Sequence, residues 1–134
     1  MKDINSTRLW TALITPMTDN GEVDYTTLEQ LCREQDQAGN GILVLGSTAE
    51  ALNLNIEEKN KIFEFVPTLN LNVPLMAGVG GINLESTTKD INYLNKLNYD
   101  CYLLVTPLYA KPGEKGQTHW FHSLLEESTK PCML

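Results

Sequence analysis

The sequence predicts an α/β protein in which parallel strands alternate with helices. Short apolar runs, rich in β-branched residues, recur at residues 9–14, 41–45, 73–77, 101–106 and 131–134. Their first residues are 32, 32, 28 and 30 positions apart, close to the length of a strand, a loop and a crossover helix. The runs lack polar alternation, so we expect strands that are buried on both faces, as in parallel sheets.

The segments between these runs carry helix signals. Asp24 is a suitable N-cap for a first helix that Gly39 would end. Asn55, followed three residues later by Glu58, resembles a capping box, and Pro67 is expected to end that second helix. The expected buried positions of the four helices are Leu28, Leu31, Cys32 and Ala38; Ile62, Phe63 and Val66; Ile91, Leu94 and Leu97; and Trp120, Phe121, Leu124 and Leu125.

The residues alone leave two architectures open. No linker or low-complexity stretch divides the 134 residues, so one domain, or part of one, is expected. Four and a half strand–helix units fit either a doubly wound open sheet or half of an eightfold barrel. The last apolar run, residues 131–134, has no helix after it, so we expect residues 1–134 to be a partial domain that is truncated within its fifth strand.

Composition narrows the class of protein. Seventeen acidic and ten basic residues give a net charge of −7, which argues against a nucleic-acid partner. The three cysteines form no C-x-x-C pair and have no nearby histidine, so neither a disulfide framework nor a metal site is expected. No apolar run is long enough to span a membrane. We therefore expect a cytoplasmic protein.

In both architectures the site lies in the loops that follow the carboxyl ends of the strands. That rule selects residues 15–16, 46–51, 78–83 and 106–116. In the second of these loops Ser47 and Thr48 supply two hydroxyls that suit a carboxylate or a phosphate, although such residues are also common in ordinary loops. Ala49 replaces the second glycine of a nucleophile elbow, so Ser47 is a poor candidate nucleophile.

The other loops carry weaker signals. Ala77–Gly81 matches neither a Walker loop nor a dinucleotide fingerprint, and a tight turn at a crowded strand end is the favoured interpretation. Tyr109 stands between two prolines and either donates or relays a proton or simply packs its loop. His119 and His122 are two candidate ligands without a third, so a surface or packing role is expected.

Taken together, the loops resemble one family, the dihydrodipicolinate synthase and N-acetylneuraminate lyase group. The similarity extends from about Leu9 to Leu134, in order and at the family's spacing. The segments that carry it are Thr11–Met17 with Gly21–Asp24, Gly46–Glu50, Pro74–Gly80 and Thr106–Pro112 with Gly116.

The resemblance implies the N-terminal half of a (β/α)₈ barrel and a Schiff-base pyruvate aldolase that needs no cofactor. In this family a strand lysine forms an imine with pyruvate, which the synthases add to aspartate semialdehyde, giving 4-hydroxy-tetrahydrodipicolinate for lysine and diaminopimelate biosynthesis. Thr48 matches the position that holds the pyruvate carboxylate. Ser47 and Tyr109 match two members of a proton relay, and this tyrosine reaches the active site of a neighbouring subunit. Family members are homotetramers, arranged as dimers of dimers.

The resemblance also predicts what this chain lacks. The imine lysine of the family would follow Leu134, and the eight lysines present lie at the terminus, on expected helices or in loops, at positions 2, 59, 61, 89, 96, 111, 115 and 130. We therefore expect the isolated chain to be inactive as an aldolase.

The sequence departs from the family pattern at several positions. Ser47, where serine is common in the lyases, keeps an N-acetylneuraminate lyase open as an alternative, and a non-catalytic truncated half-barrel is another. The loop at Tyr109 is more similar to the synthases, which we favour. Leu108, Ile56 and Lys59 replace residues of the lysine-inhibited members, so feedback inhibition by lysine is not expected.

Overall fold

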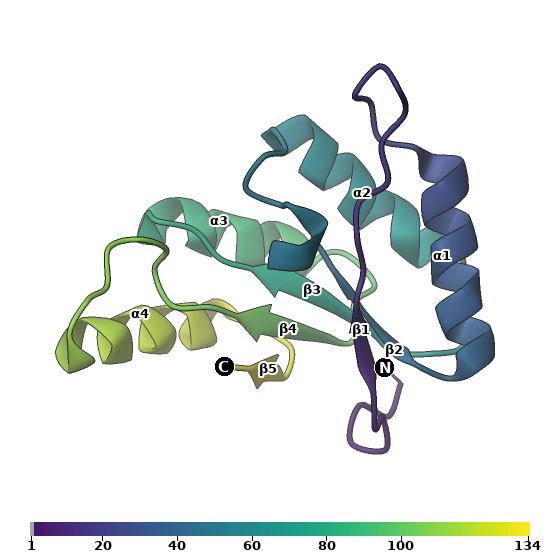
Figure 1. Ribbon diagram of the computed structural model, residues 1–134. Helices are drawn as coiled ribbons and strands as arrows, with labels where there is room; N and C mark the ends of the chain where they lie inside the picture. Colours follow the sequence, from purple (N-terminus) through teal and green to yellow (C-terminus); the bar gives the residue numbers. More distant parts are fainter. Residues whose placement is uncertain (1) are drawn as a thin grey trace.

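The computed structural model describes residues 2–134 and contains one parallel five-stranded sheet with four α-helices (Figure 1). The strands, in chain order, are β1 (Trp10–Ala12), β2 (Gly41–Val44), β3 (Leu75–Val79), β4 (Cys101–Leu104) and β5 (Cys132–Met133). Each strand pairs with the next along the chain, in the order β1-β2-β3-β4-β5. A doubly wound sheet reverses its strand order at a switch point, so this sequential order excludes that alternative.

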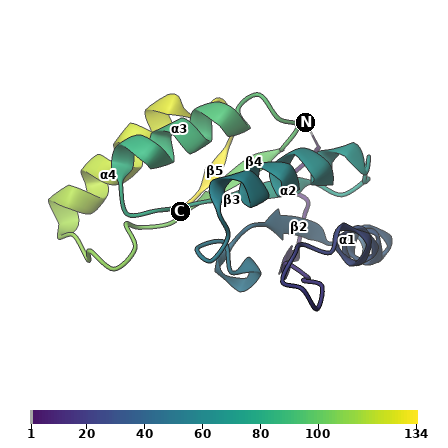
Figure 2. The ribbon, with the colours of Figure 1, turned by 90° about the horizontal axis from the view of Figure 1, so that it is seen from above.

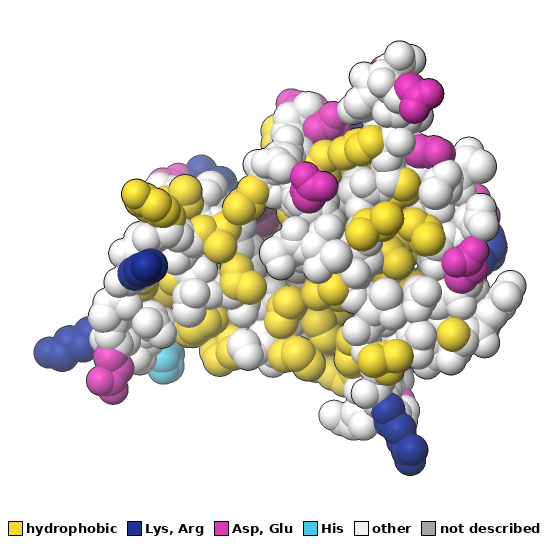
Figure 3. Space-filling model, viewed as in Figure 1, with side chains coloured by type: hydrophobic (Ala, Val, Ile, Leu, Met, Phe, Trp, Pro, Cys, Tyr) yellow, Lys and Arg dark blue, Asp and Glu magenta, His cyan; other side chains and the backbone are white. Residues whose placement is uncertain are grey.

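The two faces of the sheet have different neighbours. Residues on one face, such as Ile42, Ala77 and Tyr102, belong to the main hydrophobic core with the helices, which lie along one side of the curved sheet (Figure 2). On the other face Leu43, Met76 and Cys101 form a second, smaller cluster. Figure 3 shows hydrophobic side chains gathered over the strands in the view of Figure 1. Both faces of the central strands are thus apolar, as the sequence predicted.

The first helix, α1 (Tyr25–Ala38), begins and ends where its caps predict. The Asp24 carboxylate accepts a hydrogen bond from the Thr27 amide at 3.0 Å, and Gly39 has a φ of 74°. The prediction that Ala38 is buried was wrong, because six residues after Cys32 the helix has turned by about 240° and Ala38 faces solvent.

The second helix, α2 (Ile56–Thr68), has the predicted capping box: the Glu58 amide donates to Asn55, and the Asn55 amide donates to the Glu58 carboxylate, both at 2.9 Å. The prediction that Pro67 ends this helix was wrong, because Pro67 lies in its last turn. Proline has no N–H to donate to the carbonyl four residues earlier, that of Phe63. The hydroxyl of Tyr99 donates to this carbonyl instead, at 3.2 Å.

The remaining helices are α3 (Leu84–Leu94) and α4 (Glu114–Glu127), which pack side by side (Figure 1). The predicted core residues Ile91, Leu94, Trp120 and Leu124 are buried, and Phe121 is partly buried against the same core. Leu97 lies beyond the end of α3 but still packs against the core. Leu125 was predicted to be buried and is 41% exposed. Within residues 2–134, none of the helices is long and apolar enough to cross a bilayer.

Candidate active site at the carboxyl ends of the strands

Because all five strands are parallel, the four loops that the sequence selected lie at one edge of the sheet. A pocket of about 350 Å³ opens at this edge. Its walls come from the segment after β2, from Gly78, Val79 and Gly80 at the end of β3, and from Val105 and Leu108 after β4. Of the four loops that the sequence selected, those after β2, β3 and β4 contribute to the pocket, whereas Thr15 and Pro16 after β1 do not line it.

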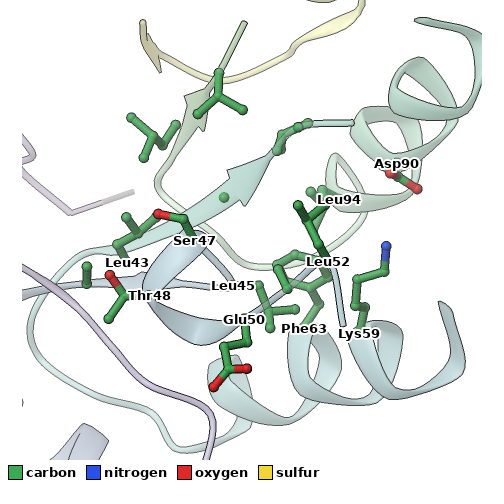
Figure 4. A pocket seen from close by; sticks show the side chains of 18 of the residues that line it. Leu43, Leu45, Ser47, Thr48, Glu50, Leu52, Lys59, Phe63, Asp90 and Leu94 are labelled. Carbon is green, nitrogen blue, oxygen red and sulfur yellow. The ribbon is translucent and has the colours of Figure 1, made fainter. Parts of the chain in front are cut away.

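A short 3₁₀ turn, η1 (Ser47–Ala49), carries the candidate hydroxyls into this pocket. The chain enters the turn through Leu45, whose φ is 57° although its side chain is buried, and leaves it through Glu50, whose φ is 53°. Figure 4 shows Ser47 and Thr48 on the side of the turn that faces Leu43. Both side chains are exposed, and neither hydroxyl has a hydrogen-bond partner within residues 2–134, so both can bind a ligand.

The glycines at the end of β3 make room for this turn. A β-carbon on Gly78 would lie 2.4 Å from the Leu45 carbonyl oxygen, and one on Gly80 would lie 2.2 Å from a methyl group of Val105. A β-carbon almost never approaches another atom so closely, so the strand end is crowded. At Gly78 the neighbours are backbone atoms that cannot rotate away, so this position needs glycine, whereas at Gly80 the Val105 side chain would have to move. The segment is a packing feature, as the sequence analysis favoured.

Tyr109 lies apart from this pocket in the isolated chain. Its side chain is 95% exposed, and it does not line the pocket. The loop has an unusual backbone, with a φ of 64° at Tyr109 and 42° at Lys111, and is attached to the preceding loop by a 3.0 Å hydrogen bond from the Leu108 amide to the Gly81 carbonyl. The structure thus brings Ser47 and Thr48 together and leaves Tyr109 outside.

The pocket also has a second region, between α2 and α3, that the sequence reasoning missed. Figure 4 shows Phe63 and Lys59 of α2 and Leu94 and Asp90 of α3 away from the Ser47 and Thr48 side of the turn. Burial raises the pKa of Asp90, and the charge of Lys59 opposes that increase. Because these residues come from two helices about 30 positions apart, no local pattern could have revealed them.

The other candidate groups take no part in the pocket. Burial raises the pKa of the Cys32 and Cys101 thiols to about 12, so neither is a ready nucleophile. His119 and His122 lie exposed on α4, in agreement with the predicted surface role. Within the described part of the chain, no three His, Cys, Asp or Glu side chains are grouped as a metal site would require.

The fold and the pocket define a class: a sequentially ordered parallel sheet with its helices on one side and its site at the carboxyl ends of the strands is the N-terminal half of a (β/α)₈ barrel. A family model described as the dihydrodipicolinate synthetase family matches residues 5–134. The chain belongs to this family.

Individual proteins agree with the family assignment. A 4-hydroxy-tetrahydrodipicolinate synthase from Francisella philomiragia is 50% identical over 132 residues, which are 98% of this chain and 44% of that relative. The chain therefore spans less than half the length of the curated relatives it matches.

Solved structures give the same result. A dihydrodipicolinate synthase from Bacillus anthracis superposes with a TM-score of 0.89 at 30% identity, covering 94% of this chain and 44% of that chain. A dihydrodipicolinate synthase from Acinetobacter baumannii, complexed with pyruvate, has a TM-score of 0.88 at 29% identity and covers 92% of this chain and 43% of that chain.

Proposed function

We propose that this chain supplies the N-terminal half of a Schiff-base pyruvate aldolase, a 4-hydroxy-tetrahydrodipicolinate synthase that condenses pyruvate with aspartate semialdehyde. The observation that carries the proposal is the η1 turn, which presents in the pocket two hydroxyls that have no hydrogen-bond partner within residues 2–134. The 50% identity to a synthase favours this reaction over that of the N-acetylneuraminate lyases. A neighbour that binds pyruvate supports the choice of substrate.

Thr48 is the proposed holder of the pyruvate carboxylate. Its hydroxyl is a hydrogen-bond donor, and the carboxylate is an acceptor with two oxygens, so the pair is a charge-assisted hydrogen bond. Leu43 gives the pocket an apolar wall beside the turn. Thr48 would thus hold the carboxylate end of the keto acid in the pocket.

Ser47 and Tyr109 are the proposed proton-relay residues. A relay needs hydroxyls within hydrogen-bond reach of one another, and in the isolated chain Tyr109 is exposed and outside the pocket. We therefore propose that Tyr109 serves the pocket of a second copy of the chain. Leu52 (70%) and Ile82 (69%), in loops at this edge, and Ile56 (46%), at the start of α2, are also exposed, and such exposure favours an interface between copies.

The imine lysine is proposed to lie outside residues 1–134. All eight lysines of the chain are outside the five strands. Lys59 is the one lysine that lines the pocket within the described residues, and it lies on α2, away from Ser47 and Thr48 (Figure 4). On this proposal residues 1–134 are a partial barrel, and the lysine comes from the part of the relatives that this chain does not span.

The first experiment tests where the lysine lies. The 134-residue chain is incubated with labelled pyruvate and borohydride, which reduces an imine to a stable amine, and is then analysed by mass spectrometry. We expect no covalent adduct. An adduct on any of the eight lysines would overturn the proposal that the imine lysine lies outside this chain.

The second experiment tests the carboxylate site without requiring catalysis. Pyruvate is titrated into the chain, and the backbone amide signals of Gly46 to Glu50 are followed by NMR. We expect saturable shifts at these residues, with a Kd on the order of 1 mM. The Thr48→Val variant should lose the response, whereas Thr26→Val, a matched change at an exposed position of α1, should keep it. An unchanged response in Thr48→Val would contradict the proposed role.

A further inference from the structure

We propose that Thr15 is a positioning residue for the pyruvate carboxylate, an inference that rests on the function proposed above. Thr15 lies in the loop after β1, and its hydroxyl donates a 2.9 Å hydrogen bond to the carbonyl of Ala49. Ala49 is the last residue of the η1 turn that carries Ser47 and Thr48. The bond therefore connects the first loop at the mouth of the barrel to the turn that holds the substrate.

The η1 turn needs such an external contact because it is weakly held by itself. Its hydrogen bonds are those from the Ala49 amide to the Gly46 carbonyl, at 3.2 Å, and from the Glu50 amide to the Ser47 carbonyl, at 3.0 Å. Its N-cap, Gly46, provides no side-chain hydrogen bond. Short 3₁₀ turns have poor hydrogen-bond geometry, and the last carbonyls of a helical segment lack partners inside it. The Thr15 hydroxyl supplies that partner for Ala49.

Thr15 is itself held in a firmly anchored loop. The Asp24 amide donates to the Pro16 carbonyl at 2.9 Å, and Met17 forms an antiparallel bridge with Val23. The loop therefore closes on itself directly after Thr15. Because this loop holds Thr15 in place, the hydrogen bond from Thr15 can restrain the η1 turn.

The two ends of the η1 turn are restrained by contacts with β3 and with the loop after β1. At its start the Leu45 carbonyl lies against Gly78 of β3, and at its end the Ala49 carbonyl accepts the bond from the β1 loop. Ser47 and Thr48 lie between these two contacts, and neither hydroxyl has a hydrogen bond of its own within residues 2–134. The place from which the Thr48 side chain enters the pocket is therefore set by the turn's backbone, which Thr15 helps to hold.

The test compares two substitutions of Thr15 in the pyruvate titration. Thr15→Val removes the hydroxyl and keeps the shape, and loss of one hydrogen bond should raise the Kd for pyruvate roughly three- to tenfold. Thr15→Ser keeps the hydroxyl and should bind within about twofold of the unsubstituted chain. Leu124→Val, a change to a fully buried residue of α4, lowers stability without touching the turn and should leave the Kd unchanged.

The outcomes distinguish a failure of the inference about Thr15 from a failure of the proposed carboxylate site. If Thr15→Val binds pyruvate as tightly as the unsubstituted chain, or if Leu124→Val weakens binding equally, Thr15 has no positioning role while the carboxylate site stands. If Thr15→Ser fails to restore binding, the hydroxyl is not what matters, and the inference is overturned. If the unsubstituted chain gives no response at Gly46 to Glu50, the carboxylate site fails, and the inference fails with it.

Discussion

Gly78 lies directly against the carbonyl group of Leu45, so closely that a β-carbon at Gly78 would meet the carbonyl oxygen at 2.4 Å and the carbonyl carbon at 2.8 Å. This contact joins β3 to the residue that leads into the η1 turn. Leu45 also has a φ of 57°, a conformation that leucine rarely adopts. Leu45 directly follows β2 and lines the pocket, and strained residues of this kind cluster at functional sites.

Gly78→Ala should therefore destabilise the fold and displace the turn. The added methyl group meets backbone atoms, which cannot rotate away, and overpacking of this kind costs about 1–3 kcal/mol. Urea denaturation would measure the change in the free energy of unfolding. Gly113→Ala is the matched control, because no atom lies within 4 Å of the added carbon, and we expect a loss of at most about 1 kcal/mol there, at an N-cap. Equal losses in the two variants would contradict the proposed contact.

Asp100→Asn should weaken the opposite end of the sheet. The Asp100 side chain is buried, and its two carboxylate oxygens accept hydrogen bonds from the Leu75 amide at 3.0 Å and the Lys2 amide at 2.7 Å. An asparagine has one acceptor oxygen, so one of the two amides would face an NH₂ group, at a cost of about 1–3 kcal/mol.

The comparison for this prediction is Asp19→Asn, which makes the same chemical change at an exposed loop position. We expect that variant to unfold within about 0.5 kcal/mol of the parent chain. Calorimetry or urea denaturation at neutral pH would measure the free energy of unfolding of both variants. A change at Asp100 as small as that at Asp19 would show that its hydrogen bonds contribute nothing to the fold.

Stability should fall in alkaline solution because of the buried thiols. Burial raises the pKa of Cys32 to about 12 in the folded state, whereas an unfolded cysteine has a pKa of about 8.5. The folded state therefore binds this proton more tightly. The associated stability is fully present below about pH 8.5 and is lost as the pH rises towards the folded value, which amounts to about 2 kcal/mol by pH 10.

Cys32→Ala tests this dependence when the free energy of unfolding is compared at pH 8 and pH 10. The variant should lose less stability between these two pH values than the parent chain does. Val66→Ala is the matched control, because Val66 is also fully buried but does not titrate. That control should keep the parent's pH dependence, and a Cys32→Ala variant that kept it too would contradict the assignment to this thiol.

The local features of the fold were predictable because their causes are local. Asp24, Gly39 and the Asn55–Glu58 capping box act within three or four residues, so the sequence located both ends of α1 and the start of α2. The 30-residue period located all five strands, although the third begins at Leu75 and ends at Val79, two residues later than predicted. Pro67 was misjudged because the hydroxyl that compensates for it, on Tyr99, comes from a distant part of the chain.

For the candidate site, the sequence by itself determined the loop that carries Ser47 and Thr48, because parallel strands place their following loops at one edge. The tertiary structure decided the rest. The strand order distinguished a barrel half from a doubly wound sheet, and folding brought Thr15 to Ala49 and Gly78 to Leu45. These contacts join residues more than 30 positions apart, and their geometry depends on how strands and helices pack, which no pattern along the chain specifies.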